Sequence, residues 1–232
     1  MRIAAVGNGP IDPRYASVID AHDMVVRFNT AHHFGTTGRR IDVLVLVNTG
    51  GSGQRMHEID GYINPAALAG AREVWIARHP EVIAAQRANP INDPLSWVDH
   101  SDAIVAKLLK GKRWRFIDAE DYLEAHSTLK TFGALDTHEP STGMVTLFHL
   151  RRTIKRPRVT LFGFTHEGWH GHPWEAERAY VAANRSWIRT APTTPTAWFR
   201  MASMAMLFAV FDLATLTLSR RYTSAMVRHC RS

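Results

Sequence analysis

Short, strongly apolar segments recur along the chain and constrain its fold more than any other feature. Residues 42–47 form a nearly continuous valine and leucine run, which is typical of a strand covered on both faces. Comparable segments lie at residues 2–6, 24–28, 73–77, 114–117 and 158–162. Between them lie helical patterns, near residues 12–20, 80–88, 101–110, 119–128, 140–150 and 173–188. This alternation predicts an α/β fold with a Rossmann-like, mostly parallel sheet flanked by helices.

Length and composition narrow the class of protein. A chain of 232 residues suits one α/β domain, or one domain with a C-terminal appendage. The formal net charge of +7 favours anionic partners without choosing among them. The single cysteine, Cys230, excludes an intramolecular disulfide and a cysteine-based metal site, and it fits a reducing compartment. The first apolar run follows Arg2 directly and is too short for a signal peptide, so we expect a cytoplasmic protein.

The C-terminal part has a different character. Two prolines between residues 190 and 195 indicate a linker, so we predict one domain over 1–195 and a separate segment over 196–232. Residues 197–218 are nearly all apolar but contain Asp212, and Arg220 and Arg221 follow them. Three interpretations stay open: a helix packed on the core, a helix lying on an anionic membrane surface, or a membrane span. The second would place the protein peripherally on the cytoplasmic face of the inner membrane.

Two polar motifs follow the first two predicted strands. Gly7, Asn8 and Gly9 form a turn before a predicted helix, and small residues there let a phosphate approach backbone amides. The full three-glycine dinucleotide pattern is absent, and a plain tight turn is the alternative. Asn29 ends the strand at 24–28, where ligands of open α/β sheets gather. Arg27, within that strand, is best interpreted as a paired structural arginine.

A third motif, Pro140-Ser141-Thr142-Gly143, begins a predicted helix. Free amides, two hydroxyls and the helix dipole at this point favour an anion. A simple helix cap is the alternative, because serine and threonine are common caps.

The fourth motif is a glycine-containing loop with three histidines, His166, His170 and His172, after the strand at 158–162. Loops at strand ends often carry functional groups, and neutral histidine is a common general base. Zinc is the rival interpretation, since the three imidazoles could converge. The spacing is not that of a helical zinc motif, and the glycines in the loop oppose a regular helix presenting ligands.

Taken together and in this order, the four motifs resemble the eukaryotic-type sialyltransferase family. Its large motif pairs Val-Gly-Asn-small with Asp-x-Val-x-Arg-x-Asn, matched at residues 6–9 and 23–29. Its small motif has Pro-Ser-Thr-Gly, then an apolar helix and a strand ending in Gly-Phe, matched at residues 140–144 and 161–164. Its last motif, histidine, four residues, then glutamate, is matched by His172 and Glu177, although His170 and Glu175 have the same spacing. The resemblance covers residues 2–50 and 139–181.

The resemblance implies a glycosyltransferase A-type variant that uses CMP-sialic acid without a metal or cofactor. Gly7, Asn8, Gly9 and Asn29 would then hold the nucleotide. The motif at 141–143 would contact the phosphate and either the donor carboxylate or cytidine. His172 would be the general base, Glu177 would orient its ring or cap the helix, and either His166 or His170 would touch the leaving phosphate.

This sequence departs from the animal members of that family, which carry an N-terminal anchor and a disulfide between two motifs. Plant and bacterial relatives suggest Kdo as an alternative sugar. We therefore predict a metal-independent inverting transferase that moves an acidic sugar, Kdo or sialic acid, from CMP to a hydroxyl of an acceptor glycan or glycolipid. Nucleic acid is not expected as a partner, because the basic residues form no stripe interleaved with aromatics. Two alternatives stay open: a non-catalytic nucleotide-binding module, and a membrane-peripheral interaction protein built around residues 197–232.

Overall fold

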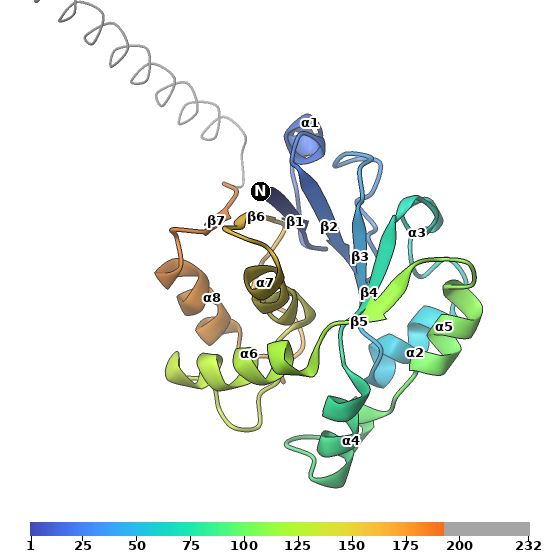
Figure 1. Cartoon of the computed structure of the whole chain (residues 1–232), viewed down its shortest axis with the longest axis vertical. Coiled ribbons are helices and arrows are strands. Elements are labelled where there is room, and N and C mark those ends of the chain that lie inside the picture. The colour runs from blue at the N-terminus through green and yellow to red at the C-terminus, as the bar shows by residue number, and fades with distance from the viewer. Residues whose placement is uncertain (193–232) are drawn as a thin grey trace, which may run out of the picture. The chain divides into compact units, whose positions relative to one another are not determined.

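The computed structural model describes residues 1–192 of the chain. The predicted boundary at residues 195 and 196 and the apolar segment 197–218 lie outside the described residues. Within the described part, one parallel sheet of seven strands has the order β5-β4-β3-β2-β1-β6-β7 (Figure 1). The strands are β1 (Arg2–Val6), β2 (Met24–Phe28), β3 (Val43–Leu46), β4 (Glu73–Ile76), β5 (Trp114–Phe116), β6 (Arg158–Phe162) and β7 (Ile188–Thr190). The predicted α/β, Rossmann-like class is therefore confirmed.

Helices lie in every connection between successive strands except the one from β2 to β3, which consists of turns. Parallel strands need such long crossover connections. The α-helices are α1 (Ala16–Asp20), α2 (Gly50–Glu58), α3 (Pro65–Gly70), α4 (Pro80–Ala88), α5 (Ser101–Leu108), α6 (Ala119–Thr131), α7 (Thr142–Thr153) and α8 (Trp174–Ala183). Two short 3-10 turns, η1 (Pro13–Tyr15) and η2 (Pro94–Trp97), complete the element list of this part of the chain.

The sheet separates two apolar layers because successive strand residues face opposite sides. Val43 and Val45 of β3 join a core with α6, α7 and α8, whereas Leu44 and Leu46 join a second core with α2, α3 and α5. Figure 1 shows the same division, with α6, α7 and α8 together on one side of the sheet. Burial on both faces explains why β3 contains only valine and leucine.

Four elements differ from the sequence prediction. Helices α2 and α3 and strand β7 were not expected. Helix α2 begins with Gly50-Gly51-Ser52-Gly53, a run with poor intrinsic helix propensity, so tertiary packing stabilises it: Met56 is buried in the second core. The last predicted helix, near 173–188, ends at Ala183 instead, and the chain then forms β7 beside β6.

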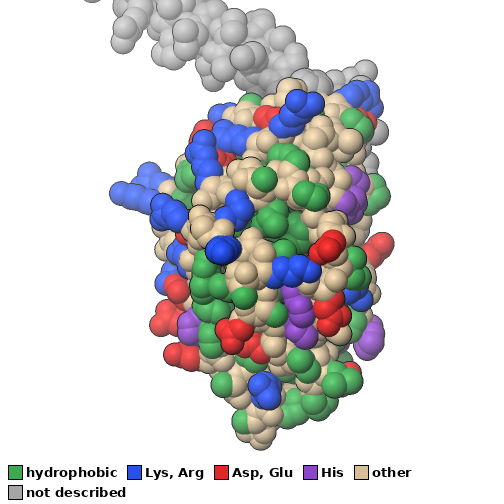
Figure 2. Space-filling model, turned by 90° about the vertical axis from the view of Figure 1, so that its right-hand side faces the viewer, with side chains coloured by type: hydrophobic (Ala, Val, Ile, Leu, Met, Phe, Trp, Pro, Cys, Tyr) green, Lys and Arg blue, Asp and Glu red, His purple; other side chains and the backbone are tan. Residues whose placement is uncertain are grey.

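The surface carries mixed charge. On the face displayed in Figure 2, basic, acidic and apolar side chains are interspersed rather than gathered in one basic stripe. Among residues 1–192, no helix combines the length and hydropathy that crossing a bilayer requires.

Candidate functional site

Strands β2 to β5 lie on one side of β1, and β6 and β7 lie on the other, so the strand order reverses between β1 and β6. Doubly wound folds commonly bind ligands at such a point. In this protein the loops after those two strands close that position. The amides of Gly7 and Gly9 donate to the carbonyls of Phe162 and Gly163, at 2.8 and 3.0 Å. A Cβ on Gly7 would lie only 2.6 Å from the Gly163 carbonyl oxygen. Glycine is therefore needed here because two backbones lie in contact. This agrees with a structural turn, the alternative to a phosphate site.

Asn8 is likewise used within the protein. Its side-chain amide donates to the Phe28 carbonyl at 2.9 Å and its oxygen accepts from the Thr30 hydroxyl at 3.1 Å. Arg27 is also paired internally: it is 1% exposed, and its guanidinium donates to the carbonyls of Thr37 and Arg40. The structure thus places Arg27 as the structural arginine that the sequence predicts.

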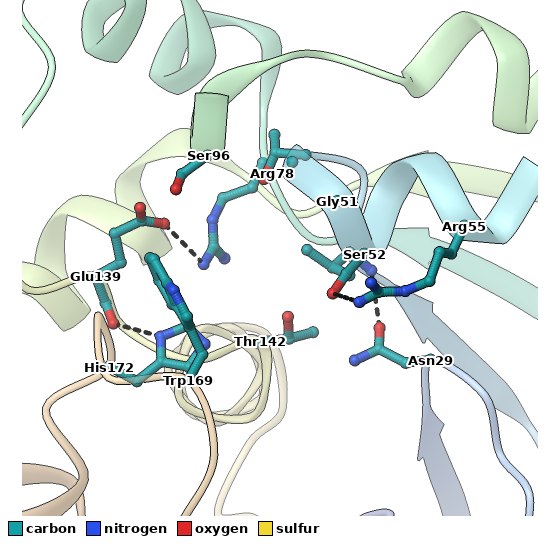
Figure 3. A pocket seen from close by; sticks show the side chains of 13 residues that line it. Asn29, Gly51, Ser52, Arg55, Arg78, Ser96, Glu139, Thr142, Trp169 and His172 are labelled. Carbon is teal, nitrogen blue, oxygen red and sulfur yellow. Dashed lines mark hydrogen bonds and ion pairs between the residues drawn. The ribbon is translucent and has the colours of Figure 1, made fainter. Parts of the chain in front are cut away.

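A pocket of about 350 Å³ lies along the same edge of the sheet, beyond the ends of β2, β3 and β4. This volume is within the usual range of small-molecule sites. Figure 3 draws its lining side chains, which come from several elements, and labels ten of them. The lining consists of Asn29, Val47, Thr49, Gly50, Gly51, Ser52, Arg55, Arg78, Ser96, Glu139, Thr142, Trp169 and His172.

One wall comes from the segments that follow β2 and β3. Asn29 has a left-handed backbone, with φ of 50°, and its side-chain oxygen accepts from the Val47 amide at 2.9 Å. Asparagine tolerates this conformation better than most residues. The first residues of α2 lie beside it, and Arg55 donates to the Ser52 hydroxyl at 3.3 Å.

The floor of the pocket is formed by Arg78, which follows β4 and is 1% exposed. Its Nη2 donates to the Pro140 carbonyl at 2.8 Å and lies 3.8 Å from the carboxylate of Glu139. Glu139 also accepts from the side-chain amide of Asn92 at 2.6 Å. Burial raises the pKa of Glu139, although the nearby Arg78 acts in the opposite direction.

The opposite wall begins at α7, whose start at Thr142 confirms the predicted helix. Ser141 caps this helix by accepting from the Met144 amide at 3.2 Å. The backbone amide and the hydroxyl of Ser141 donate to the two carboxylate oxygens of Glu177, at 2.8 and 2.9 Å. Gly143 packs against Phe164, whose ring would lie 2.7 Å from an added Cβ. Ser141, Gly143 and Glu177 therefore lie behind the pocket wall, and only Thr142 of this motif lines it.

Burial raises the pKa of Glu177 to about 7, despite two hydrogen bonds from Ser141 that favour its ionised form. Glu177 is 2% exposed and contacts Ser141 rather than His172. The histidine and glutamate that the sequence pairs as a catalytic unit are thus not joined by a hydrogen bond here.

His172 lines the pocket, but its ring is fixed by the backbone. Its Nδ1 lies 2.8 Å from the Glu139 carbonyl, an oxygen that can only accept, so Nδ1 carries the proton and Nε2 is left as the acceptor. Burial lowers the pKa of His172 to about 4. The ring also packs edge-on against Trp169 and Trp174.

The other two histidines of the loop, His166 and His170, do not line the pocket. His166 has φ of 52° and its Nδ1 lies 4.0 Å from the Glu177 carboxylate. Burial lowers the pKa of His166, and the charge of Arg178 adds to that effect. His170 is exposed and contacts the ring of Trp169. Across residues 1–192, these three histidines form no cluster with metal-binding spacing.

A different group has that spacing: Asp118, Asp121 and His149, whose ligand atoms lie within 4.8 Å of one another. The guanidinium of Arg152 lies where a metal ion would be bound by these residues. Its Nε and Nη2 donate to Asp121 at 2.7 and 2.9 Å, and Nη2 also contacts Asp118. Although burial opposes ionisation, these contacts hold the pKa of Asp121 below its ordinary value. The cluster is therefore an ion-pair network between α6 and α7.

Of the predicted site residues, the pocket brings together Asn29, Thr142 and His172, while Gly7, Asn8, Gly9, Ser141, Gly143, His166, His170 and Glu177 do not line it. Sequence reasoning missed Arg55, Arg78 and the start of α2. Signals for them existed. Arg78 follows a predicted strand in the same way that Asn29 does, and the glycine-rich run at 50–53 follows the most strongly predicted strand.

Fold and site together define an α/β protein with a Rossmann-like parallel sheet and a small-molecule pocket at the carboxyl edge of its strands. No family model matches the chain. The urease operon 23 kDa accessory protein of Rhizobium meliloti (strain 1021) is 32% identical over 188 residues, which cover 78% of this chain and 87% of that protein. The chain belongs to the family of this accessory protein.

Among solved structures, a mammalian sialyltransferase is similar at 16% identity and a TM-score of 0.46, covering 83% of this chain and 69% of that one. A likeness this low carries no argument about function. The sialyltransferase resemblance therefore extends only to a weak structural likeness.

Membership of the accessory-protein family overturns the sequence-based prediction of function. The predicted transfer of Kdo or sialic acid from CMP is wrong, and so is the assignment as a glycosyltransferase. The predicted partners, a CMP-activated sugar and an acceptor glycan or glycolipid, are wrong for the same reason. The motifs misled because several of their residues serve the fold: Gly7 and Gly9 allow a backbone crossing, and Ser141 caps a helix.

Proposed function

We propose that this chain is an accessory protein in urease production that binds a small ligand in its pocket and performs no sugar transfer. The observation that carries this proposal is the relationship to the urease operon accessory protein, which extends over 87% of that protein. This proposal is close to the alternative of a non-catalytic binding module that the sequence left open, and it includes no sugar-transfer reaction.

The geometry of the pocket supports binding over catalysis. A general base needs access to a substrate proton and a partner that orients it. His172 lines the pocket and is oriented by a backbone carbonyl, but burial lowers its pKa to about 4, so it is a weak base near neutral pH. Glu177, the predicted partner of His172, is buried against Ser141 instead. Glu177 therefore joins α8 to the start of α7, and His172 joins the loop at 163–173 to the Glu139 backbone.

The test is urease activity in a host strain that lacks the gene and is complemented with variants. The intact chain should restore activity, whereas Ser52→Trp, which fills the pocket, should not. Ser17→Trp is the matched control, because Ser17 is an exposed residue of α1 outside the pocket lining. Immunoblots of the urease subunits separate a loss of active enzyme from a loss of its synthesis. Unchanged urease activity in the deletion strain would refute the accessory role.

A second assay addresses chemistry directly. Purified chain incubated with CMP-sialic acid or CMP-Kdo and glycan acceptors should release no CMP above the buffer control. Sustained release that disappears in His172→Ala would refute the binding-only proposal.

A further inference from the structure

Arg78 is a buried cation whose hydrogen bonds are incomplete. Two of its guanidinium nitrogens, Nε and Nη1, are buried and have no hydrogen-bond partner among the described residues. The third, Nη2, is engaged by Pro140 and approaches Glu139. A guanidinium stays charged, and leaving its buried donors unpaired is costly. Figure 3 shows this group at the pocket, between Glu139 and the start of α2.

The start of α2 adds unpaired backbone donors on one side of the pocket. Thr49 precedes the helix but makes no side-chain capping hydrogen bond, and no acidic residue lies in the first turn. The Gly50 amide is used by the Val98 carbonyl, whereas the amides of Gly51 and Ser52 have no partner within residues 1–192. The nearest atom to an added Cβ on Gly51 is 4.0 Å away, so a ligand can approach this backbone closely.

The start of α7 adds donors on the other side. This helix spans Thr142–Thr153 and also lacks acidic residues in its first turn. Thr142 lines the pocket, and neither its amide nor its hydroxyl donates to a group in the described chain. Two helix N-termini therefore border one pocket, each with partial positive charge and free amides.

The charges of the lining favour an anion. Arg55 and Arg78 are its two cations, and Glu139 is its one carboxylate. His172 adds no charge near neutral pH because burial holds its pKa at about 4. Donors that approach from three sides suit a tetrahedral group with several acceptor oxygens better than a planar carboxylate. Trp169, 38% exposed at the rim, offers a flat surface to the remainder of such a ligand.

We infer that the ligand of this pocket is a phosphate monoester of the nucleoside monophosphate class, with its phosphate held by Arg78 and the N-termini of α2 and α7. This inference rests on the proposed function only in taking the pocket as the ligand site. Arg55 is exposed and already donates to the hydroxyls of Ser52 and Tyr62, so it contributes less than Arg78 does.

Isothermal titration calorimetry on the full chain tests this assignment. The probes are inorganic phosphate, CMP, AMP, ribose 5-phosphate, cytidine and adenosine, each at low and moderate salt. Compounds with a phosphate should bind, and nucleosides without one should not. Binding of inorganic phosphate without binding of CMP or AMP would overturn the nucleotide assignment and identify free phosphate as the ligand. Equal binding of nucleosides and nucleotides would overturn the inference.

Variants locate the phosphate. Arg78→Lys keeps the charge but loses the fork of donors, so affinity for CMP and AMP should fall on the order of tenfold to a hundredfold. Arg55→Met should lower affinity by less. Arg87→Met is the matched control: Arg87 is exposed on α4, outside the lining, and its loss should leave affinity unchanged.

A second variant keeps the test decisive if Arg78→Lys does not fold. Ser52→Glu places a carboxylate at the start of α2 without altering the buried network, and it should abolish phosphate binding; Arg87→Glu is its control. Unchanged affinity in Ser52→Glu would overturn the inference. Phosphate binding together with urease restoration by Ser52→Trp would refute the proposed function and leave this inference standing. Absence of phosphate binding, together with failure of Ser52→Trp to restore urease activity, would refute this inference and leave the proposed function standing.

Discussion

Two stretches of the same sheet edge behave in opposite ways. At the closed edge (residues 7–9 and 163–165), the loops after β1 and β6 cross at backbone contact. The amides of Gly7 and Gly9 and the side chain of Asn8 are paired there. At the pocket edge (residues 49–55 with Arg78 and Thr142), two helix N-termini and a buried arginine have unpaired donors. Both edges are rich in glycine and small polar residues. Glycine there marks either a backbone that must touch another backbone or one that a ligand must approach, and only the neighbours decide which.

The largest expected contrast in the free energy of unfolding is between alanine substitutions at one glycine of each edge, Gly7 and Gly51. Gly7→Ala drives a Cβ to 2.6 Å from a carbonyl oxygen that belongs to backbone, so it should destabilise the fold by about 3 kcal/mol. Gly51→Ala meets nothing nearer than 4.0 Å and improves helix propensity, so it should be neutral or stabilise by up to about 1 kcal/mol. Urea unfolding of both variants measures the contrast. Similar free energies of unfolding for the two would show that the closed edge is not packed as described.

The buried carboxylate behind the pocket wall, Glu177, should give a pH-dependent effect of intermediate size. The folded-state pKa of Glu177 is about 7, above the ordinary 4.5, so the native state retains a proton that the unfolded chain releases. Its contribution to stability is therefore full at low pH and is lost as pH rises from about 5 to 7.

Glu177→Gln removes this titration while keeping an acceptor for Ser141. Relative to the unchanged chain, the variant should gain roughly 2 kcal/mol of stability between about pH 5 and pH 7. The depressed pKa of His172 acts in the opposite sense, with stability lost as pH falls from 6.5 toward about 4. Because His172 is present in both chains, the difference between them isolates Glu177. A difference that does not change with pH would contradict the raised pKa.

The smallest expected contrast is between one polar residue of each edge. Asn8→Ala removes the hydrogen bonds to Phe28 and Thr30 and should cost about 1–2 kcal/mol, without changing ligand affinity. Ser96→Ala, in the pocket lining, removes a hydroxyl that has no partner in the described chain, so stability should not change. Thermal unfolding and calorimetric titration report the two quantities separately. Weaker ligand binding in Asn8→Ala at unchanged stability would move the ligand toward the closed edge.

The sequence by itself determined the fold class and most element positions of residues 1–192. Strands such as β3 are predictable because burial on both faces demands an unbroken apolar run. The start of α7 is predictable because Ser141 satisfies an amide only three residues away. The structural role of Arg27 followed from its place within a buried strand. These signals are local, so a linear pattern contains them.

Only the tertiary structure decided which edge is open and what each motif does. The partner of Ser141 is Glu177, and Arg78 meets Pro140 far along the chain; such contacts leave no mark in local spacing. Helix α2 forms from a glycine-rich run because Met56 is buried beneath it, which overrides propensity. The loops after β1 and β6 fill the switch point because Gly7 and Gly163 allow their backbones to touch. Packing between distant segments therefore placed the pocket beside Arg78, where no sequence motif had pointed.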